Sequence, residues 1–374
     1  MIDPANFYKE LSKNNIDFFT GVPDSLLKNF CAYVEDNVGD NQHIIAANEG
    51  NAIGLAAGYH MATEKIPLVY LQNSGLGNCI NPLTSLADQE VYSIPLLLLI
   101  GWRGEPGIQD EPQHIKQGRI TQEQLELLGI DYLVMDADSD ISELIFNCLK
   151  KIKINKSPVA ILVKKNSFSK YLLKQNKQKA SNFTREQAIK VIVELSNDDD
   201  IFISTTGKCS RELYEIRTQR GEAQKDFLTV GSMGHTSSIA LGVALSVKDR
   251  NIICLDGDGS ILMHLGALPV ISSVAPKNLL HVILNNGCHE SVGGQPTVIN
   301  KVDLRKLSYA FDYANYFEAH NSQELIENWK EISCSEGPSL LHININSSSR
   351  EDLSRPKTTA LANKHEFMQS IKDG

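Results

Sequence analysis

Short apolar segments alternate with helix-like stretches in two successive halves of the chain. In the first half the apolar segments are residues 43–47, 67–72, 93–100 and 159–163, and in the second half they are residues 201–204, 252–255, 279–284 and 340–345. The segment at 93–100 is continuously apolar, which is typical of a strand that is covered on both faces. The pattern predicts an α/β protein with two mainly parallel sheets, each carrying helices on both faces.

A change in composition separates the two halves. Residues 164–181 are rich in Lys, Gln, Asn and Ser and contain six lysines. Such a basic run could bind nucleic acid, but a solvated linker is the favoured interpretation in an acidic chain. Thr184 with Gln187 three residues later has the form of a helix start. We therefore expect a first domain at 1–165, a linker at 166–183 and a second domain at 184–374, of which 346–374 is a polar arm.

Composition and charge narrow the classes of function. A length of 374 residues fits two domains, and the formal net charge of −9 argues against a nucleic-acid partner. No apolar run reaches the roughly 20 residues that span a bilayer. The seven cysteines are scattered and none forms a Cys-x-x-Cys pair, so neither a disulfide framework nor a zinc ribbon is expected. These features predict a soluble cytoplasmic protein with free thiols and no membrane partner.

The candidate chemistry lies in two turns of the second half. Gly257, Asp258 and Gly259 follow one apolar strand, 25 residues separate Gly259 from Asn285, and Asn286 follows the next strand. A right-handed crossover brings both turns to the carboxyl edge of one sheet, where open α/β sheets bind ligands. The carboxylate and amide oxygens of Asp258 and Asn286 suit Mg²⁺, which commonly bridges protein groups to a diphosphate.

Other interpretations of these turns are weaker. A calcium loop needs glycine at the position of Ile261, and no Gly-Lys-Ser/Thr follows to make a phosphate-binding Walker loop. Each dipeptide alone could be a plain turn. The two turns at this spacing, each directly after an apolar strand, are the more specific signal.

The paired turns resemble the cofactor motif of the thiamine-diphosphate-dependent enzymes. The resemblance implies two thiamine-diphosphate-binding folds, with thiamine diphosphate and Mg²⁺ as cofactors. It implies that Asp258, Asn286 and the Cys288 carbonyl bind the metal. It further implies that the remaining cofactor contacts come from Gly257, Gly259, Ser260, Gly231, Met233, His235 and Lys208. Met233 would bend the cofactor, although an ordinary core methionine remains an alternative.

Glu49 is the candidate catalytic acid. It follows an apolar segment and opens a helix of very small residues, and the resemblance implies that it hydrogen-bonds the pyrimidine ring of the cofactor. The alternative is a glutamate that interacts favourably with the helix dipole. The expected linker occupies the place at which larger members of this superfamily carry a central third domain. The resemblance therefore implies a pyrimidine-binding and a diphosphate-binding domain, and a homodimer or higher oligomer with active sites between subunits.

Several further stretches resemble the phosphonopyruvate decarboxylase family and its sulfopyruvate decarboxylase relatives. They include residues 20–25, 72–78, 205–213, 289–297 and 350–356. The resemblance implies decarboxylation of the small 2-oxo acid phosphonopyruvate to phosphonoacetaldehyde and CO₂ in phosphonate biosynthesis. The alternatives are sulfopyruvate as substrate, a carboligase, or a cofactor-binding subunit without catalysis. Residues expected to contact the substrate are Ser25, Asn73, Ser74, Arg103, Lys208 and His289. Residues 101–118 form either a lid or an ordinary surface loop.

Overall fold

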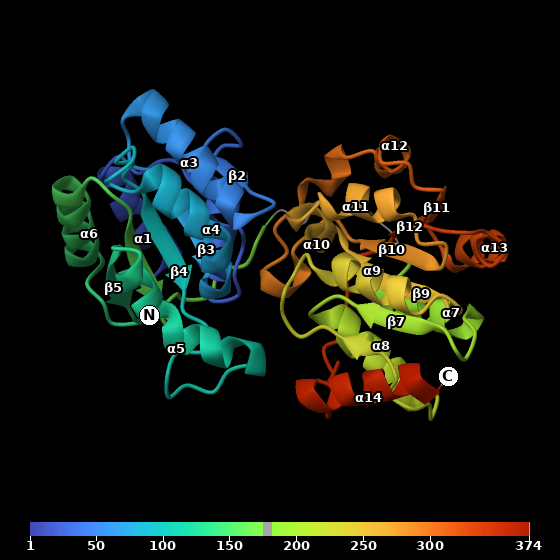
Figure 1. The fold of residues 1–374 in the computed structure, drawn as a ribbon. Coiled ribbons are helices and arrows are strands. Elements are labelled where there is room, and N and C mark those ends of the chain that lie inside the picture. The colour runs from blue at the N-terminus through green and yellow to red at the C-terminus, as the bar shows by residue number, and fades with distance from the viewer. Residues whose placement is uncertain (175–181, 374) are drawn as a thin grey trace. The chain divides into compact units, whose positions relative to one another are not determined.

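The computed structural model describes residues 1–174 and 182–373, which form two compact units (Figure 1). The first unit holds the described part of residues 1–176 together with residues 289–296. The second holds the described part of residues 177–288 together with residues 297–374. The expected linker at 166–183 falls partly on residues 175–181, which lie outside the described residues.

The first unit is built on a six-stranded parallel sheet with the strand order β2-β1-β3-β4-β6-β5. Its strands are β1 (Phe19–Gly21), β2 (His43–Ile45), β3 (Leu68–Gln72), β4 (Leu97–Gly101), β5 (Asp131–Met135) and β6 (Val159–Val163). Its helices are α1 (Pro4–Lys13), α2 (Lys28–Asn37), α3 (Glu49–Thr63), α4 (Leu76–Pro82), α5 (Pro112–Leu127) and α6 (Ile141–Asn155), with short turns at η1 (Asn73–Gly75) and η2 (Leu83–Ala87).

Alternate residues of these strands serve two separate cores. On β3, Leu68 and Tyr70 pack with residues of α1, α2 and α6, whereas Val69 and Leu71 pack with residues of α3 and α4. Successive side chains of a strand point to opposite faces, so the sheet is covered by helices on both faces. This is why the inner strands β4 and β6 are apolar and buried at every position.

The second unit repeats the plan with the strand order β11-β12-β10-β9-β7-β8, again all parallel. Its strands are β7 (Ile201–Ser204), β8 (Phe227–Leu228), β9 (Ile252–Gly257), β10 (Leu279–Asn285), β11 (Asn315–Ala319) and β12 (Ser339–Asn344). Its helices are α7 (Arg185–Leu195), α8 (Lys208–Gln219), α9 (Thr236–Ser246), α10 (Asp258–Met263), α11 (Ala267–Val274), α12 (Leu304–Ala310), α13 (Ser322–Ile332) and α14 (Ala360–Asp373), with short turns at η3 (Glu290–Val292) and η4 (Val298–Lys301).

This sheet also separates two cores. On β9, Ile253 and Leu255 pack with residues of α7, α8 and α13, while Ile252 and Cys254 pack with residues of α9, α10 and α11. The prediction of two mainly parallel sheets with helices on both faces is therefore confirmed. No helix in the described ranges is long and apolar enough to cross a membrane.

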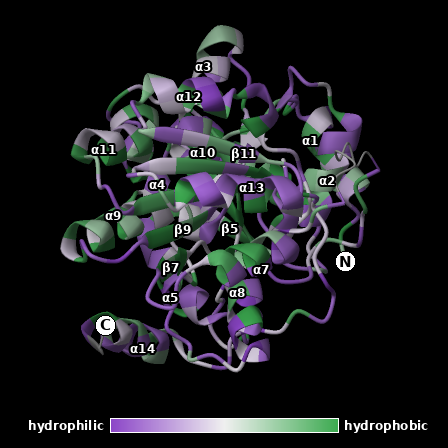
Figure 2. Cartoon of the chain, turned by 90° about the vertical axis from the view of Figure 1, so that its right-hand side faces the viewer, coloured by the Kyte–Doolittle hydropathy of each residue, from purple (hydrophilic) through white to green (hydrophobic). Residues whose placement is uncertain are grey.

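The structure differs from the expectations at the margins of the sheets. The edge strands β5, β8 and β11 were not expected. The side chains of β5 and β11 are mostly half-buried and mix polar with apolar residues, and β8 has only two residues. The expected polar arm at 346–374 contains α14, which has the mixed colouring of an amphipathic helix (Figure 2). Asn363 and Phe367 of this helix are buried, and the Asn363 side chain accepts from the Leu228 N–H of β8 at 3.0 Å.

Candidate active site

The two predicted metal-binding turns lie at the ends of adjacent strands in the second unit. Strand β9 ends at Gly257 and α10 begins at Asp258, while Asn286 directly follows β10. The two strands are paired in parallel, with Leu284 opposite Gly257. The crossover predicted from the sequence therefore brings both turns to one edge of the sheet.

Asp258 is a buried carboxylate, 3% exposed, and its main hydrogen-bond donors among the described residues are neutral groups. Its Oδ2 accepts from the Thr297 hydroxyl at 2.5 Å, and the backbone N–H groups of Gly259 and Asn286 also act on it. Burial raises the pKa of Asp258 from 3.8 to about 6, although these hydrogen bonds lower it. Because the main groups of the described residues that act on this carboxyl include no cation, the site fits a divalent metal ion, which would supply positive charge.

Asn286 lies beside Asp258, as its N–H contact with that carboxyl requires. The Asn286 Oδ1 accepts from the Cys288 N–H at 3.1 Å, which shapes the turn. This turn places the backbone of Cys288 close to Asn286. The three residues that were expected to bind the metal thus belong to one local arrangement.

A third segment, residues 231–235, reaches the same edge. The Gly234 N–H donates to Ser260 Oγ at 3.1 Å, and the ring of His235 lies 4.5 Å from that of His264. Gly234 has a φ of +88°, and a Cβ there would lie 2.5 Å from the His264 ring, so this position requires glycine. Gly231 and Met233 are half-buried. Met233 is therefore not enclosed as an ordinary core residue would be.

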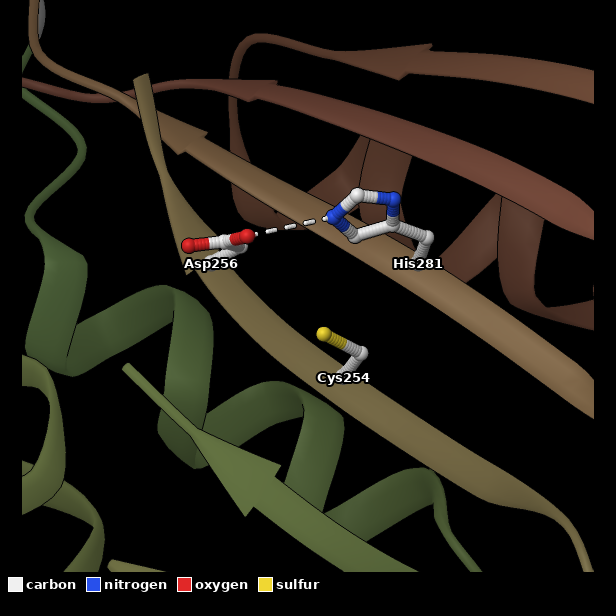
Figure 3. Close-up of side chains that lie close together, drawn as sticks. All are labelled: Cys254, Asp256 and His281. Atoms are coloured by element: carbon white, nitrogen blue, oxygen red, sulfur yellow. Dashed lines mark ion pairs between the residues drawn. The ribbon is translucent and has the colours of Figure 1, made fainter. Parts of the chain in front are cut away.

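Three fully buried polar side chains support this edge from within the sheet. Cys254 and Asp256 belong to β9, and His281 belongs to β10. Each offers one atom that could bind a metal ion, namely a thiol sulfur, a carboxylate oxygen or a ring nitrogen, and these atoms all lie within 4.8 Å of one another (Figure 3). Asp256 Oδ2 lies 3.4 Å from His281 Nε2, while its Oδ1 accepts from the Gly257 N–H at 2.9 Å. The cluster therefore ties the turn before Asp258 to the neighbouring strand.

Lys208 begins the helix that follows β7. It is the first residue of α8, and its Nζ donates to Ser349 Oγ at 2.6 Å. Lys208 lines a cavity of about 340 Å³ together with Arg211 and residues 349–351 and 353. The Arg350 guanidinium in this cavity is already paired with Glu186, Glu215 and Asp352.

In the first unit, Glu49 is the first residue of α3 and is only 6% exposed. The Asn48 side chain caps the helix by accepting from the Gly50 N–H, and Glu49 Oε2 accepts from Asn78 Nδ2 at 2.8 Å. Burial raises the pKa of Glu49, while the Asn78 hydrogen bond and the backbone N–H of Glu49 lower it. A buried acid whose pKa is raised at the start of a helix has the character of a proton-transfer group. Asn78 was not identified as a site residue from the sequence, although it ends the stretch 72–78.

The structure brings two expected substrate residues of the first unit together. The Arg103 guanidinium donates to Ser25 Oγ at 2.7 Å and forms a bidentate ion pair with Asp110, whose Oδ2 lies 2.7 Å from Nε. Burial tends to raise the pKa of Asp110, but Arg103 and two backbone N–H groups hold it well below its usual range. Asp110 was not singled out from the sequence, because only the folded loop shows its partner.

Asn73 and Ser74 have different environments. Asn73 is fully buried, and its side chain accepts from the Arg103 N–H at 3.2 Å and donates to the Arg103 carbonyl at 2.8 Å, so it anchors the Arg103 backbone. Ser74 is exposed, and its Oγ accepts from Gln72 at 2.5 Å. His289 begins the segment 289–296, and its N–H donates to the Gln295 carbonyl at 2.8 Å.

The expected loop at 101–118 is shorter in the structure. Helix α5 begins at Pro112, so its first turn and the residues up to 118 are helical. Contacts join the two ends of the remaining loop. Asp110, near its end, accepts from the Gly104 N–H at 2.8 Å and pairs with Arg103, and both partners lie at its start. These contacts define one closed arrangement of the loop.

Asp24, next to Ser25, is expected to make stability depend on pH. It is fully buried, its Oδ1 has no hydrogen-bond partner among the described residues, and burial raises its pKa from 3.8 to about 6. Between about pH 4 and pH 6 the folded state holds a proton that the unfolded state releases, so the stabilisation falls as pH rises through that range. Asp24→Asn should remove this fall and gain up to about 3 kcal/mol relative to wild type above pH 6.

Urea unfolding of both proteins between about pH 4 and pH 7.5 measures the effect. A difference in unfolding free energy that does not change with pH would contradict the assignment to Asp24.

Two family descriptions match the sequence. "Thiamine pyrophosphate enzyme, N-terminal TPP binding domain" covers residues 5–126, and "Thiamine pyrophosphate enzyme, C-terminal TPP binding domain" covers residues 205–343. A phosphonopyruvate decarboxylase from Streptomyces viridochromogenes is 32% identical over 96% of this chain and 92% of its own length. A sulfopyruvate decarboxylase from Methanosarcina acetivorans is 28% identical over 92% of this chain and 91% of its own length.

A further relative is divided between two chains. The sulfopyruvate decarboxylase subunit beta of Methanococcus maripaludis is 32% identical over 50% of this chain and 98% of its own length. Its subunit alpha is 36% identical over 42% of this chain and 90% of its own length.

Proposed function

We propose that this chain, which belongs to the thiamine pyrophosphate enzyme family, decarboxylates phosphonopyruvate to phosphonoacetaldehyde and CO₂ in phosphonate biosynthesis. The enzyme uses thiamine pyrophosphate, also called thiamine diphosphate. The choice of substrate is supported by the likeness to a phosphonopyruvate decarboxylase over 96% of the chain. When bound, the cofactor supplies an electron sink for the carbanion that loss of CO₂ leaves behind.

The residues of the second unit fit the diphosphate end of this cofactor with Mg²⁺. The observation that carries this assignment is the buried Asp258 carboxylate, which has Asn286 beside it and whose main hydrogen-bond donors in the described part of the chain are neutral. Asp258, the Asn286 side chain and the Cys288 carbonyl would hold the ion. Gly231, Met233, His235, Gly257, Gly259 and Ser260 would line the cofactor. We also include Lys208, the first residue of α8, as a cation that would contact the cofactor.

In the first unit, Glu49 would hold and exchange a proton with the ring of the cofactor. Its burial favours the protonated acid and raises its pKa, while the Asn78 hydrogen bond favours the carboxylate. Ser25 and Arg103 would bind an anionic group of the substrate, since they supply a hydroxyl and a guanidinium at one place. Ser74 and His289 complete the proposed substrate set, and Asn73 acts by fixing the backbone of Arg103.

We further propose a homodimer or higher oligomer, with a pyrimidine-binding domain at 1–165, a linker at 166–183 and a diphosphate-binding domain at 184–374. Helix α3 is apolar on both sides and leaves Leu55 37% and Met61 65% exposed, and Ile80 of α4 is also exposed. A helix that is apolar all round is normally covered, which supports a partner subunit here. An active monomer in analytical sedimentation would contradict the oligomer. The seven free thiols support a cytoplasmic location.

The decisive experiment measures CO₂ release from phosphonopyruvate and from sulfopyruvate, each with and without the cofactor and Mg²⁺. We expect release that depends on both additions and a higher kcat/KM for phosphonopyruvate. A higher kcat/KM for sulfopyruvate would transfer the proposal to the substrate named for the Methanosarcina acetivorans relative. Absence of release from both substrates would reject it.

A further inference from the structure

We propose that Asn78 is a positioning residue for Glu49: its amide holds one carboxyl oxygen, fixes the orientation of the carboxyl group, and favours the ionised acid. This inference rests on the proposed function, in which Glu49 exchanges a proton with the cofactor. It adds a residue that acts through Glu49.

The two carboxyl oxygens of Glu49 have different surroundings. Oε2 accepts from Asn78 Nδ2 at 2.8 Å. Oε1 lies above Gly75, where an added Cβ would come within 2.4 Å of it. The carboxyl is therefore held on one side by a hydrogen bond and packed on the other against a glycine that leaves room only for that oxygen.

Close packing of two helices keeps Asn78 in reach. A Cβ at Gly50, next to Glu49 on α3, would lie 2.7 Å from the Asn78 carbonyl on α4. Because Gly50 has no side chain, the backbone of α4 can approach the start of α3. The packing of the α3 and α4 backbones therefore keeps the Asn78 amide within hydrogen-bond distance of the Glu49 carboxyl.

Among the groups around Glu49, the side-chain amide of Asn78 contributes most to stabilising the carboxylate. Burial, which penalises the carboxylate, has the largest effect on the pKa of Glu49, and the Asn78 hydrogen bond is the largest opposing effect. In the described part of the chain, the titratable neighbour on α4 is Cys79, whose pKa is raised by burial and then by the charge of Glu49. The Cys79 thiol thus stays neutral, and removal of the Asn78 donor would leave the carboxylate without a side-chain donor.

The test compares Asn78→Leu with Asn155→Leu. Asn155 Nδ2 donates to Asp131 Oδ2 at 2.8 Å in the same unit, so the control removes the same kind of bond far from Glu49. The first readout is the infrared carboxylic-acid band that Glu49→Gln removes, followed against pH in the cofactor-free protein. The second is the pH profile of kcat/KM for CO₂ release.

For Asn78→Leu we expect the Glu49 band to persist to higher pH and the matching limb of the profile to move in the same direction. The expected loss in kcat/KM at neutral pH is about tenfold or more, since a hydrogen bond to a charged group is lost. Asn155→Leu should change neither readout. If Asn78→Leu fails to fold, Asn78→Asp keeps the size of the side chain and replaces the donor with a like charge, and the same upward shift is expected.

Two outcomes would overturn the inference, and they are distinguishable. If Glu49→Gln is inactive but the Asn78 variants leave the Glu49 titration unchanged, the positioning role fails while the proposed function stands. If Glu49→Gln retains wild-type turnover, the catalytic assignment of Glu49 fails and the inference fails with it.

Discussion

Glu49→Gln is expected to lower kcat for CO₂ release about a thousandfold while leaving Mg²⁺-dependent cofactor binding largely intact. Glutamine preserves the shape of the side chain at the start of α3 and can still accept from Asn78, but it cannot take up or release a proton. Steady-state kinetics and calorimetric titration of the cofactor measure the two effects separately.

The same variant is expected to be more stable than wild type at high pH. Burial raises the pKa of Glu49, so the folded state binds its proton more tightly than the unfolded state does, and this stabilisation is lost as pH rises through the folded pKa. Glutamine does not titrate, and its advantage should therefore grow with pH. Glu64→Gln, at the exposed far end of the same helix, is the control and should change neither turnover nor stability. Normal turnover in Glu49→Gln would remove the catalytic assignment.

Asp258→Ala is expected to abolish Mg²⁺-dependent binding of the cofactor, with an apparent Kd raised about a hundredfold or more. Asp258 is the carboxylate at the metal-binding turn, and Asn286 beside it supplies only neutral groups, so the variant lacks the charge that attracts the ion. Calorimetric titration of thiamine diphosphate with and without Mg²⁺ measures this loss.

A matched control separates charge at this site from charge in general. Asp249 is an exposed aspartate of the same unit, and Asp249→Ala should bind the cofactor like wild type. Thr297→Val removes the hydroxyl that donates to Asp258 and should weaken binding less than the loss of the carboxylate does. Full Mg²⁺-dependent binding by Asp258→Ala would exclude this turn as the metal site.

The sequence predicted those features that depend on strand order and spacing. Apolar segments and the 25 residues between Gly259 and Asn285 were sufficient to expect the two turns at one sheet edge, because parallel crossovers have a fixed hand. Glu49 was also singled out as a candidate, since its position after a strand and before a helix of small residues is local. The edge strands β5, β8 and β11 and the helix α14 were missed, because tertiary contacts rather than local pattern stabilise them.

Side-chain partners that are distant in sequence were beyond prediction. Asn78 lies 29 residues from Glu49, and Ser25 lies 78 residues from Arg103. Asp110 is close to Arg103 in sequence, but only the folded loop shows that its carboxylate forms an ion pair with the Arg103 guanidinium. Asn73 is predicted to contact substrate, and the structure adds that its amide also bonds the Arg103 backbone, which lies 30 residues away.

The size of the side chain at position 75 limits the size of the side chain at position 49. A methyl group there would meet the Oε1 of Glu49, although the backbone of Gly75 itself is compatible with alanine. Functional variants recovered from a library randomised at both positions should therefore show covariation. Those that keep glutamate at 49 should retain glycine at 75, and any that accept alanine at 75 should carry the shorter aspartate at 49.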